Sequence, residues 1–259
     1  MPIEEKGSQD VRHLYTESYF LNEATGHSEF SNFKGEYDQL IDKFRFVLKK
    51  LELSPAESLL DIGCGRGELV IYHALQGGNA TGVDFSEDAV RLAEEKAKEL
   101  GSPCRFSISS FQDINENEVY DRIISLDFIE HISAGEAGIF MRKCYKLLKD
   151  GGRLLIFTYP NTLRRRYGYK IIRYFSFLKN KPLPKNETDT LSKHYKEYHL
   201  NEQNFLTLNR LARHAGFKDF QITYYDPSVK ESFLKKILVG TPFRHLFLKG
   251  LTLVAVKNS

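Results

Sequence analysis

The sequence predicts an α/β fold in which helices cover both faces of a doubly wound, mostly parallel sheet. Short apolar segments alternate along the chain with segments whose apolar residues recur at helical spacing. A glycine-rich loop directly follows the first apolar segment, and an aspartate ends the second. Because ligands of such sheets bind beyond the carboxyl ends of the strands, these two features predict a ligand site at that edge.

Seven segments are predicted to be strands because each is short, rich in apolar residues and bounded by turn residues. In chain order they are residues 58–62, 80–85, 104–108, 121–126, 154–158, 217–225 and 251–256. Helical segments separate the first five strands, so we expect these five to be parallel.

The predicted helices have recognisable beginnings and ends. Residues 37–51 carry apolar side chains at helical spacing, which places one helix before the first strand. Ser133 and Glu136 form an S-x-x-E capping box for a helix that runs to about Lys149. Asn201 is the expected N-cap of the helix that precedes the last two strands.

The alternation stops between residues 161 and 199, which we interpret as an inserted helical cap. No acidic residue occurs between Gly151 and Asn186, and apolar residues recur there at near-helical spacing, so we expect a basic amphipathic helix. A second basic and apolar segment is expected at residues 230–245. The basic residues of the cap are Arg164, Arg165, Arg166, Lys170, Arg173, Lys179, Lys181 and Lys185.

Length and composition are typical of one globular catalytic domain with a cap. Hydrophobic residues make up 41% of the 259 residues and charged residues 27%, and the net charge of +3 means that any surface for polyanions has to be local. We expect the catalytic domain at residues 58–259, with the cap at about 161–199. A helical N-terminal segment, residues 1–57, is expected to contribute to the cover of the active site.

Several kinds of site and location are disfavoured. Cys64, Cys104 and Cys144 form no CxxC pair, so we expect no zinc site and no disulfide framework, and no other metal site is predicted. The N-terminus MPIEEKGSQD is polar, and no apolar run approaches the roughly 18 residues of a membrane helix. We therefore expect a cytoplasmic protein without an export signal or a membrane span.

Two motifs predict what the ligand site binds. The loop DIGCGRG at residues 61–67 places glycines where the backbone must turn sharply and come close to a ligand. The next helix offers unpaired N–H groups to an anionic part of that ligand. Asp84 follows Gly63 by about 20 residues, the spacing at which a carboxylate accepts hydrogen bonds from ribose hydroxyls.

Four ordered motifs make the chain resemble the class I S-adenosylmethionine-dependent methyltransferases, in their small-molecule branch. The motifs are LLDIGCGRGEL, GVDFSEDAV, YDRIISLDFIEHI and LLKDGGRLLIFTYPN. The resemblance is close over residues 59–161 and looser over residues 200–257. It implies the strand order 3-2-1-4-5-7-6, S-adenosylmethionine as the cofactor and S-adenosylhomocysteine as its product.

The resemblance also implies the residues that bind the cofactor. Many family members have an acidic residue at the adenine edge where this chain has Ser110, which can accept a hydrogen bond from the adenine amino group but carries no charge. The implied contacts are Asp61, Gly63, Cys64 and Gly65 for the methionine half, Asp84 for the ribose, Phe85, Ser110 and Phe111 for the adenine, and Leu126 and Asp127 beside the sulfonium methyl.

The acceptor is predicted from what the sequence has and lacks. Amine-methylating enzymes for nucleobases commonly carry an (Asp/Asn/Ser)-Pro-Pro-aromatic motif after the fourth strand, where this chain has SLDF. His131, His194 and His199 are candidate bases for a hydroxyl acceptor, because histidine titrates near working pH. We therefore expect O-methylation of a small-molecule, lipid-linked or glycan acceptor.

Two other functions remain as alternatives. An RNA methyltransferase would use the basic cap for phosphate contacts. A nicotinamide-dependent oxidoreductase is less well supported, because the sixth position of a GxGxxG motif counted from Gly63 is Glu68, whose charge would face a pyrophosphate. The cap itself has three interpretations: a surface for an anionic membrane, a patch for RNA, or a lid with a solvated charged side.

Overall fold

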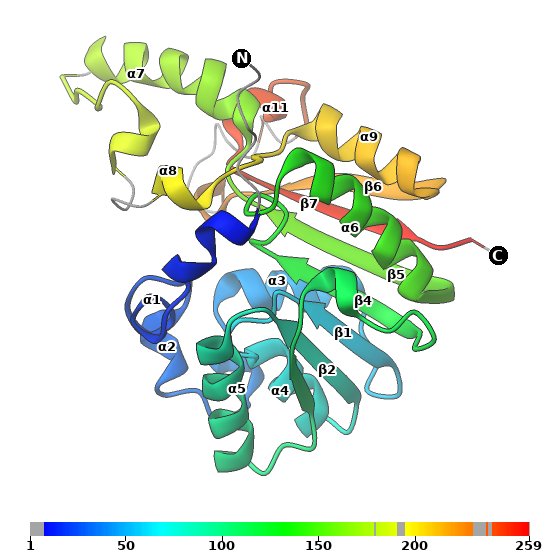
Figure 1. Cartoon of the computed structure of the whole chain (residues 1–259). Coiled ribbons are helices and arrows are strands. Elements are labelled where there is room, and N and C mark those ends of the chain that lie inside the picture. The colour runs from blue at the N-terminus through cyan, green and yellow to red at the C-terminus, as the bar shows by residue number, and fades with distance from the viewer. Residues whose placement is uncertain (1–7, 179, 191–194, 230–236, 238–239, 259) are drawn as a thin grey trace.

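A seven-stranded sheet with the order β3-β2-β1-β4-β5-β7-β6 forms the centre of the protein (Figure 1). The computed structural model describes the chain apart from residues 1–7, 179, 191–194, 230–236, 238–239 and 259. Strand β7 is antiparallel to both β5 and β6, and the other neighbours are parallel. The predicted strand order and the mostly parallel sheet are confirmed.

The observed strands fall at the predicted segments, with one clear difference. They are β1 (Ser58–Ile62), β2 (Asn79–Asp84), β3 (Arg105–Ile108), β4 (Tyr120–Leu126), β5 (Leu148–Thr158), β6 (Asp219–Tyr225) and β7 (Gly250–Val256). Strand β5 begins at Leu148 rather than at residue 154, because Leu148 pairs with Tyr120 of β4. The Gly151 amide also donates to the Lys257 carbonyl beyond the end of β7. The expected helix to Lys149 therefore ends earlier, at Leu147.

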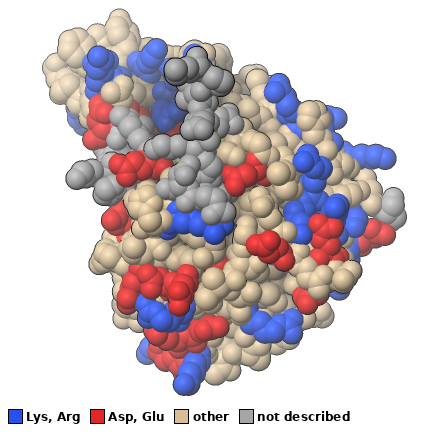
Figure 2. Space-filling model, viewed as in Figure 1, with Lys and Arg blue, Asp and Glu red and all other residues tan. Residues whose placement is uncertain are grey.

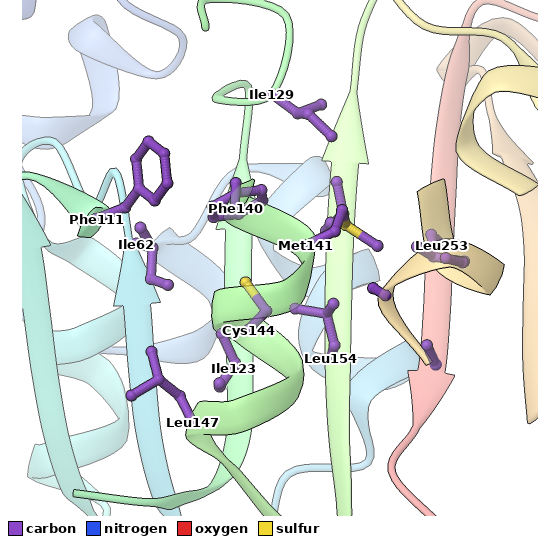
Figure 3. Close-up of a cluster of buried hydrophobic side chains, with 14 of the residues drawn as sticks. Ile62, Phe111, Ile123, Ile129, Phe140, Met141, Cys144, Leu147, Leu154 and Leu253 are labelled. Atoms are coloured by element: carbon purple, nitrogen blue, oxygen red, sulfur yellow. The ribbon is translucent and has the colours of Figure 1, made fainter. Parts of the chain in front are cut away.

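Helices cover both faces of the sheet, as a doubly wound fold requires (Figure 1). On one face, α6 directs Phe140, Met141 and Cys144 toward strand residues such as Ile123 and Leu154 (Figure 3). Helix α9 packs on the same face, while α3 and α4 bury their apolar sides on the other. The longer helices are α3 (Asp42–Leu51), α4 (Glu68–Leu75), α5 (Glu87–Glu99), α6 (Ala134–Leu147), α7 (Tyr169–Leu178) and α9 (Phe205–Ala215). The short ones are α1 (Glu17–Asn22), α2 (His27–Phe30), α8 (Tyr195–Tyr198) and α11 (Arg244–Phe247).

Helix caps confirm one prediction and correct another. Ser133 and Glu136 form the expected capping box at the start of α6. The N-cap of α9 is Asn204, not Asn201, because the Asn204 side chain accepts hydrogen bonds from the Leu206 and Thr207 amides. The amide of Asn201 instead donates to the Glu130 carbonyl in the loop after β4.

The cap is anchored at its base and projects from the sheet at its end. A π-helical turn at Arg164–Gly168 leads into α7, which extends away from the strands (Figure 1). Gly168 lies directly against α11, where an added Cβ would come within 1.7 Å of the Leu246 carbonyl oxygen. The second basic segment predicted at residues 230–245 lies largely outside the described residues. In the part of the chain that is described, no helix is long and apolar enough to cross a membrane.

Replacing Gly168 by alanine should therefore destabilise the protein. The new methyl group would be forced against the α11 backbone. Overpacking of this kind usually lowers the free energy of unfolding by about 1–3 kcal/mol. The control is Gly138→Ala in α6, where the nearest atom to the new Cβ is the Arg142 guanidinium at 3.6 Å. This control should stabilise the protein by roughly 0.5–1 kcal/mol, because alanine favours helix more than glycine does. Urea denaturation measures both, and equal stabilities would contradict the close contact.

Candidate active site

A cavity of about 820 Å³ lies beyond the carboxyl ends of β1, β2, β4 and β5. Its volume falls within the roughly 300–1,000 Å³ that is usual for small-molecule sites. Every residue that the sequence assigns to the cofactor lines it, and so do His131 and His199. The third candidate base, His194, lies outside the described residues. The wall contains Asp61, Gly63, Cys64, Gly65, Asp84, Phe85, Ser110, Phe111, Leu126 and Asp127.

The glycine loop is held against the end of β2 by backbone hydrogen bonds. The amides of Gly63 and Cys64 donate to the Val83 carbonyl at 2.8 and 3.1 Å, and the Gly65 amide donates to the Asp84 carboxylate at 2.9 Å. Gly63 has a φ of +77°, and a Cβ there would lie 2.6 Å from the Phe128 ring. Glycine is required at this position for both reasons, its conformation and the close approach.

Two buried carboxylates give the loop its electrostatic character. Asp84 also accepts a hydrogen bond from the Ser86 amide at 2.9 Å. Burial raises the pKa of Asp84, while the amides of Ser86 and Gly65 oppose the rise. Burial, followed by the charges of Asp84 and Glu68, raises the pKa of Asp61 well above its usual range. The loop therefore favours a ligand that brings hydrogen-bond donors or positive charge.

Arg66 joins the glycine loop to residues 11–44, the part of the N-terminal segment that lines the cavity. Its buried guanidinium donates to the Phe20 carbonyl at 2.6 Å, the Thr25 carbonyl at 2.7 Å and the Glu68 carboxylate at 2.9 Å. The ring of Phe30 packs 4.9 Å from it. The sequence places Arg66 in the loop but gives no sign of this role, because the two carbonyls that it binds lie more than 40 positions away.

The N-terminal segment forms one wall of the cavity. Ser86 donates its hydroxyl to the Tyr15 carbonyl at 2.8 Å, and the Glu17 amide donates to Asp88 at 2.9 Å. The Tyr15 ring lies edge-on to Phe85, with 5.1 Å between the ring centroids. These contacts place the N-terminal segment directly over the loops that follow β1 and β2.

The histidines lie together next to the N-terminal segment, where the His131 ring is 5.9 Å from the Tyr15 ring. The Nδ1 of His131 donates to the Tyr198 carbonyl at 2.8 Å, and the rings of His131 and His199 are 4.8 Å apart. Burial lowers the pKa of His131, and burial together with His131 and Arg165 lowers the pKa of His199 to about 3. Both rings are therefore neutral at neutral pH, and the Nε2 of His131 carries no proton because its Nδ1 is the donor.

The loop after β4 carries the predicted Asp127 and a second carboxylate, Glu130, and Asp127 pairs with Lys43, a residue for which the sequence predicts no role in the site. Asp127 adopts a positive φ of 49°, and its carboxylate pairs with the buried Lys43 of α3. Glu130 is buried and accepts hydrogen bonds from the Thr158 hydroxyl at 2.9 Å and the Tyr159 amide at 3.1 Å. A lysine within the apolar pattern of residues 37–51 was the available signal for Lys43. Within the described residues, no group of three or more His, Cys, Asp or Glu side chains is placed to hold a metal.

Several solved structures share this fold. Phosphoethanolamine N-methyltransferase 2 of Haemonchus contortus aligns with a TM-score of 0.60 and 19% identity, over 94% of this chain and 60% of its own. Magnesium protoporphyrin IX methyltransferase of Synechocystis, solved with S-adenosylhomocysteine, aligns with a TM-score of 0.56 and 19% identity, over 95% and 99%. Mycolic acid cyclopropane synthase CmaA1, also solved with S-adenosylhomocysteine, aligns with a TM-score of 0.59 and 16% identity, over 89% and 94%.

The sheet order, the glycine loop and Asp84 at one cavity define a class I S-adenosylmethionine-dependent methyltransferase, which confirms the resemblance seen in the motifs. The chain belongs to the mycolic acid cyclopropane synthetase family, whose profile matches residues 21–214. S-adenosylmethionine is accordingly the cofactor of the class. The membership favours methyl transfer over the nicotinamide-dependent alternative.

Curated relatives align with part of the chain. Sphingolipid C9-methyltransferase 1 of Gibberella zeae is 27% identical over 60% of this chain, which spans 30% of that protein's length. Ubiquinone biosynthesis O-methyltransferase of Vibrio atlanticus is 28% identical over 60% of this chain and 67% of its own length. A probable fatty acid methyltransferase of Pseudomonas putida is 26% identical over 44% of this chain and 30% of its own length.

The buried Glu130 predicts a specific dependence of stability on pH. Burial, with the charge of Asp127 next, raises the pKa of Glu130 to about 8. Between about pH 4.5 and 8 the folded protein holds a proton that the unfolded chain has released, so stability falls as pH rises. Relative to Glu130→Gln, the parent protein should lose on the order of 1.4 kcal/mol of unfolding free energy per pH unit in this window.

Urea denaturation of the two proteins at pH 5, 6, 7 and 8 measures this difference. The exposed Glu94 provides a matched control, because Glu94→Gln should leave the pH dependence of the parent unchanged. A constant difference between the parent and Glu130→Gln across the window would contradict the buried, protonated carboxyl.

Proposed function

We propose that this protein transfers the methyl group of S-adenosylmethionine to a hydroxyl oxygen of a small or lipid-linked acceptor. One observation carries the proposal: a single cavity joins the glycine loop and Asp84 to the histidine wall and to Asp127. The proposed cofactor residues and a set of polar groups able to receive a proton thus line one cavity. Methyl transfer needs such a shared site, because the nucleophile has to be aligned with the methyl group and shielded from water.

The cofactor is proposed to lie along the wall that the sequence assigns to it. The glycine loop and Asp61 would hold the methionine half, and Asp84 would accept hydrogen bonds from the ribose hydroxyls. The two buried carboxylates support this placement, because the cofactor brings an ammonium group and ribose donors to them. Phe85, Ser110 and Phe111 would surround the adenine, and Leu126 and Asp127 would lie beside the reacting methyl.

His131 is proposed to accept the proton of the acceptor hydroxyl. Its Nδ1 is engaged by the Tyr198 carbonyl, which leaves Nε2 as the basic atom and fixes the orientation of the ring. His199 is a poorer base, since its pKa is lowered to about 3, and it would act by packing against His131. The role assigned to His194 remains an expectation from the sequence.

The acceptor is proposed to be at least partly apolar. Beyond Asp127 the cavity is lined by Phe44, Phe157, Tyr159 and Tyr225, which offer aromatic and apolar surface. The names of two relatives refer to sphingolipid and to ubiquinone biosynthesis, which agrees with a partly apolar acceptor. The N-terminal segment and the cap would together cover this space during the reaction.

Methyl transfer into a cell extract distinguishes the acceptor classes. The protein is incubated with extract and S-adenosylmethionine labelled in the methyl group, and the products are separated into lipid, small-molecule and RNA pools. We expect label in the lipid or small-molecule pool, and an O-methyl carbon signal when the label is ¹³C. Label confined to RNA would overturn the proposal in favour of the RNA alternative, and an N- or C-methyl signal would overturn O-methylation.

We further propose that α7 rests on an anionic membrane surface from the cytoplasmic side. Four of its large apolar side chains are more than half exposed: Tyr174, Phe175, Phe177 and Leu178. Lys and Arg side chains lie among uncharged residues on this projection (Figure 2). The basic surface is smaller than the sequence suggested, because Arg164 pairs with Glu187 and Arg165 with Glu202. Arg166, Lys170 and Arg173 remain exposed, which suits an interfacial helix.

Replacing Phe175, Phe177 and Leu178 together by serine should abolish this contact. Co-sedimentation with phosphatidylglycerol vesicles should fall about ten-fold or more, because each buried apolar side chain contributes about 1.5–3 kcal/mol. In the control, serine replaces three exposed apolar residues outside α7: Val119, Ile139 and Leu206. Added salt should weaken the binding of the parent. If the parent protein does not bind these vesicles at low salt, the membrane proposal is wrong and the cap is a solvated lid.

A further inference from the structure

Two buried polar atoms in the cavity wall have no hydrogen-bond partner among the described residues. They are the Nε of Arg12 and the hydroxyl of Tyr15, and both residues line the cavity. Folded proteins pair nearly all buried donors and acceptors, so each exception needs an explanation. An oxygen-bearing ligand in the cavity would supply the partner that both donors lack.

Arg12 and Tyr15 lie next to each other in space. The Tyr15 amide donates to the Arg12 carbonyl at 3.1 Å, which places the two side chains on one turn of the chain. The Arg12 guanidinium lies 5.1 Å from the centre of the Phe85 ring, and the Tyr15 ring lies 5.1 Å from the same ring. The two donors thus flank one aromatic side chain of the cavity wall.

The charge of Arg12 is not neutralised by any carboxylate that the structure describes. Two other cations of the same wall are neutralised: Lys43 pairs with Asp127, and Arg66 pairs with Glu68. An arginine that faces a cavity without an acidic partner is suited to bind a carboxylate or a phosphate, which its planar group can contact through two N–H donors.

Tyr15 keeps its phenol proton and can therefore donate a hydrogen bond. Burial, followed by the neighbouring Tyr19, Glu130 and Asp84, raises the pKa of the Tyr15 phenol, which keeps it protonated. The nearby carboxylates are already engaged, Asp84 by the Gly65 and Ser86 amides and Glu130 by Thr158 and Tyr159. Arg12 and Tyr15 both line the same cavity.

We propose that Arg12 and Tyr15 form a subsite for an anionic group, a carboxylate or a phosphate, carried by the methyl acceptor. This inference rests on the proposed function and narrows the acceptor to a hydroxyl compound that bears such a group. The carboxylate of the cofactor offers the same chemistry, so the test has to separate the two sources. The cofactor residues assigned above, from Asp61 to Asp127, do not include Arg12 or Tyr15.

Inorganic phosphate is the probe, observed by broadening of its ³¹P signal on addition of protein, with and without saturating S-adenosylhomocysteine. We expect the parent to broaden the signal equally in both states. Arg12→Gln should weaken phosphate binding about ten-fold or more, and Tyr15→Phe by a smaller factor, as expected for a charge-assisted and a neutral hydrogen bond. Arg12→Lys should bind with intermediate strength, because it keeps the charge and loses the paired donors.

The matched control is Arg210→Gln, at an exposed arginine of α9 far from the cavity, which should behave as the parent. Calorimetry on the same proteins should give S-adenosylhomocysteine affinities within about two-fold of the parent, since neither Arg12 nor Tyr15 is among the residues assigned to the cofactor and Phe85 itself is unchanged. Competition between phosphate and S-adenosylhomocysteine, with loss of both in Arg12→Gln, would assign the donors to the cofactor and overturn the subsite. Normal binding of S-adenosylhomocysteine without phosphate binding would also overturn it, while leaving the proposed function intact.

Discussion

The hydrogen bond from the Gly65 amide to the buried Asp84 carboxylate is the interaction on which the site depends. It fixes the glycine loop against the end of β2 and thereby sets the direction of Arg66, the next residue. Arg66 then holds the Phe20 and Thr25 carbonyls, so the N-terminal segment follows the position of the loop. Ser86, whose amide also donates to Asp84, binds the Tyr15 carbonyl from the other side. A cavity wall built from distant parts of the chain is thus organised around one carboxylate.

Much of the fold could be predicted because its signals are local. The alternation of apolar segments and the capping box at Ser133 depend on neighbours along the chain, and the structure confirms both. The predictions were wrong where an element's boundary depends on a partner that is far away in the sequence. Strand β5 starts early because Leu148 pairs with Tyr120, and Asn201 does not cap α9 because its amide is bound to the Glu130 carbonyl. Such contacts join segments whose proximity the sequence does not reveal.

The residues of the site also fall into those that the sequence predicts and those that it does not. The glycine loop and Asp84 were predictable from motif and spacing, and the fold brings all the assigned cofactor residues to one cavity. The roles of Arg66 and Arg12 were not predictable, because an arginine in a sequence does not reveal whether it is paired, buried or open to a ligand. Arg164 illustrates the converse, since a residue that belongs to a basic run proves to be buried against Glu187. Charge counts therefore overestimated the basic surface of the cap.

Titration calorimetry with S-adenosylhomocysteine tests the central role of Asp84 most directly. The parent should bind, and Asp84→Asn should bind about ten-fold more weakly or worse, because it loses the charge that accepts the Gly65 amide and that we propose to accept the ribose hydroxyls. Asp219→Asn, at an exposed aspartate where β6 begins, is the control and should bind as the parent does. Equal affinity for the parent and Asp84→Asn would contradict the account.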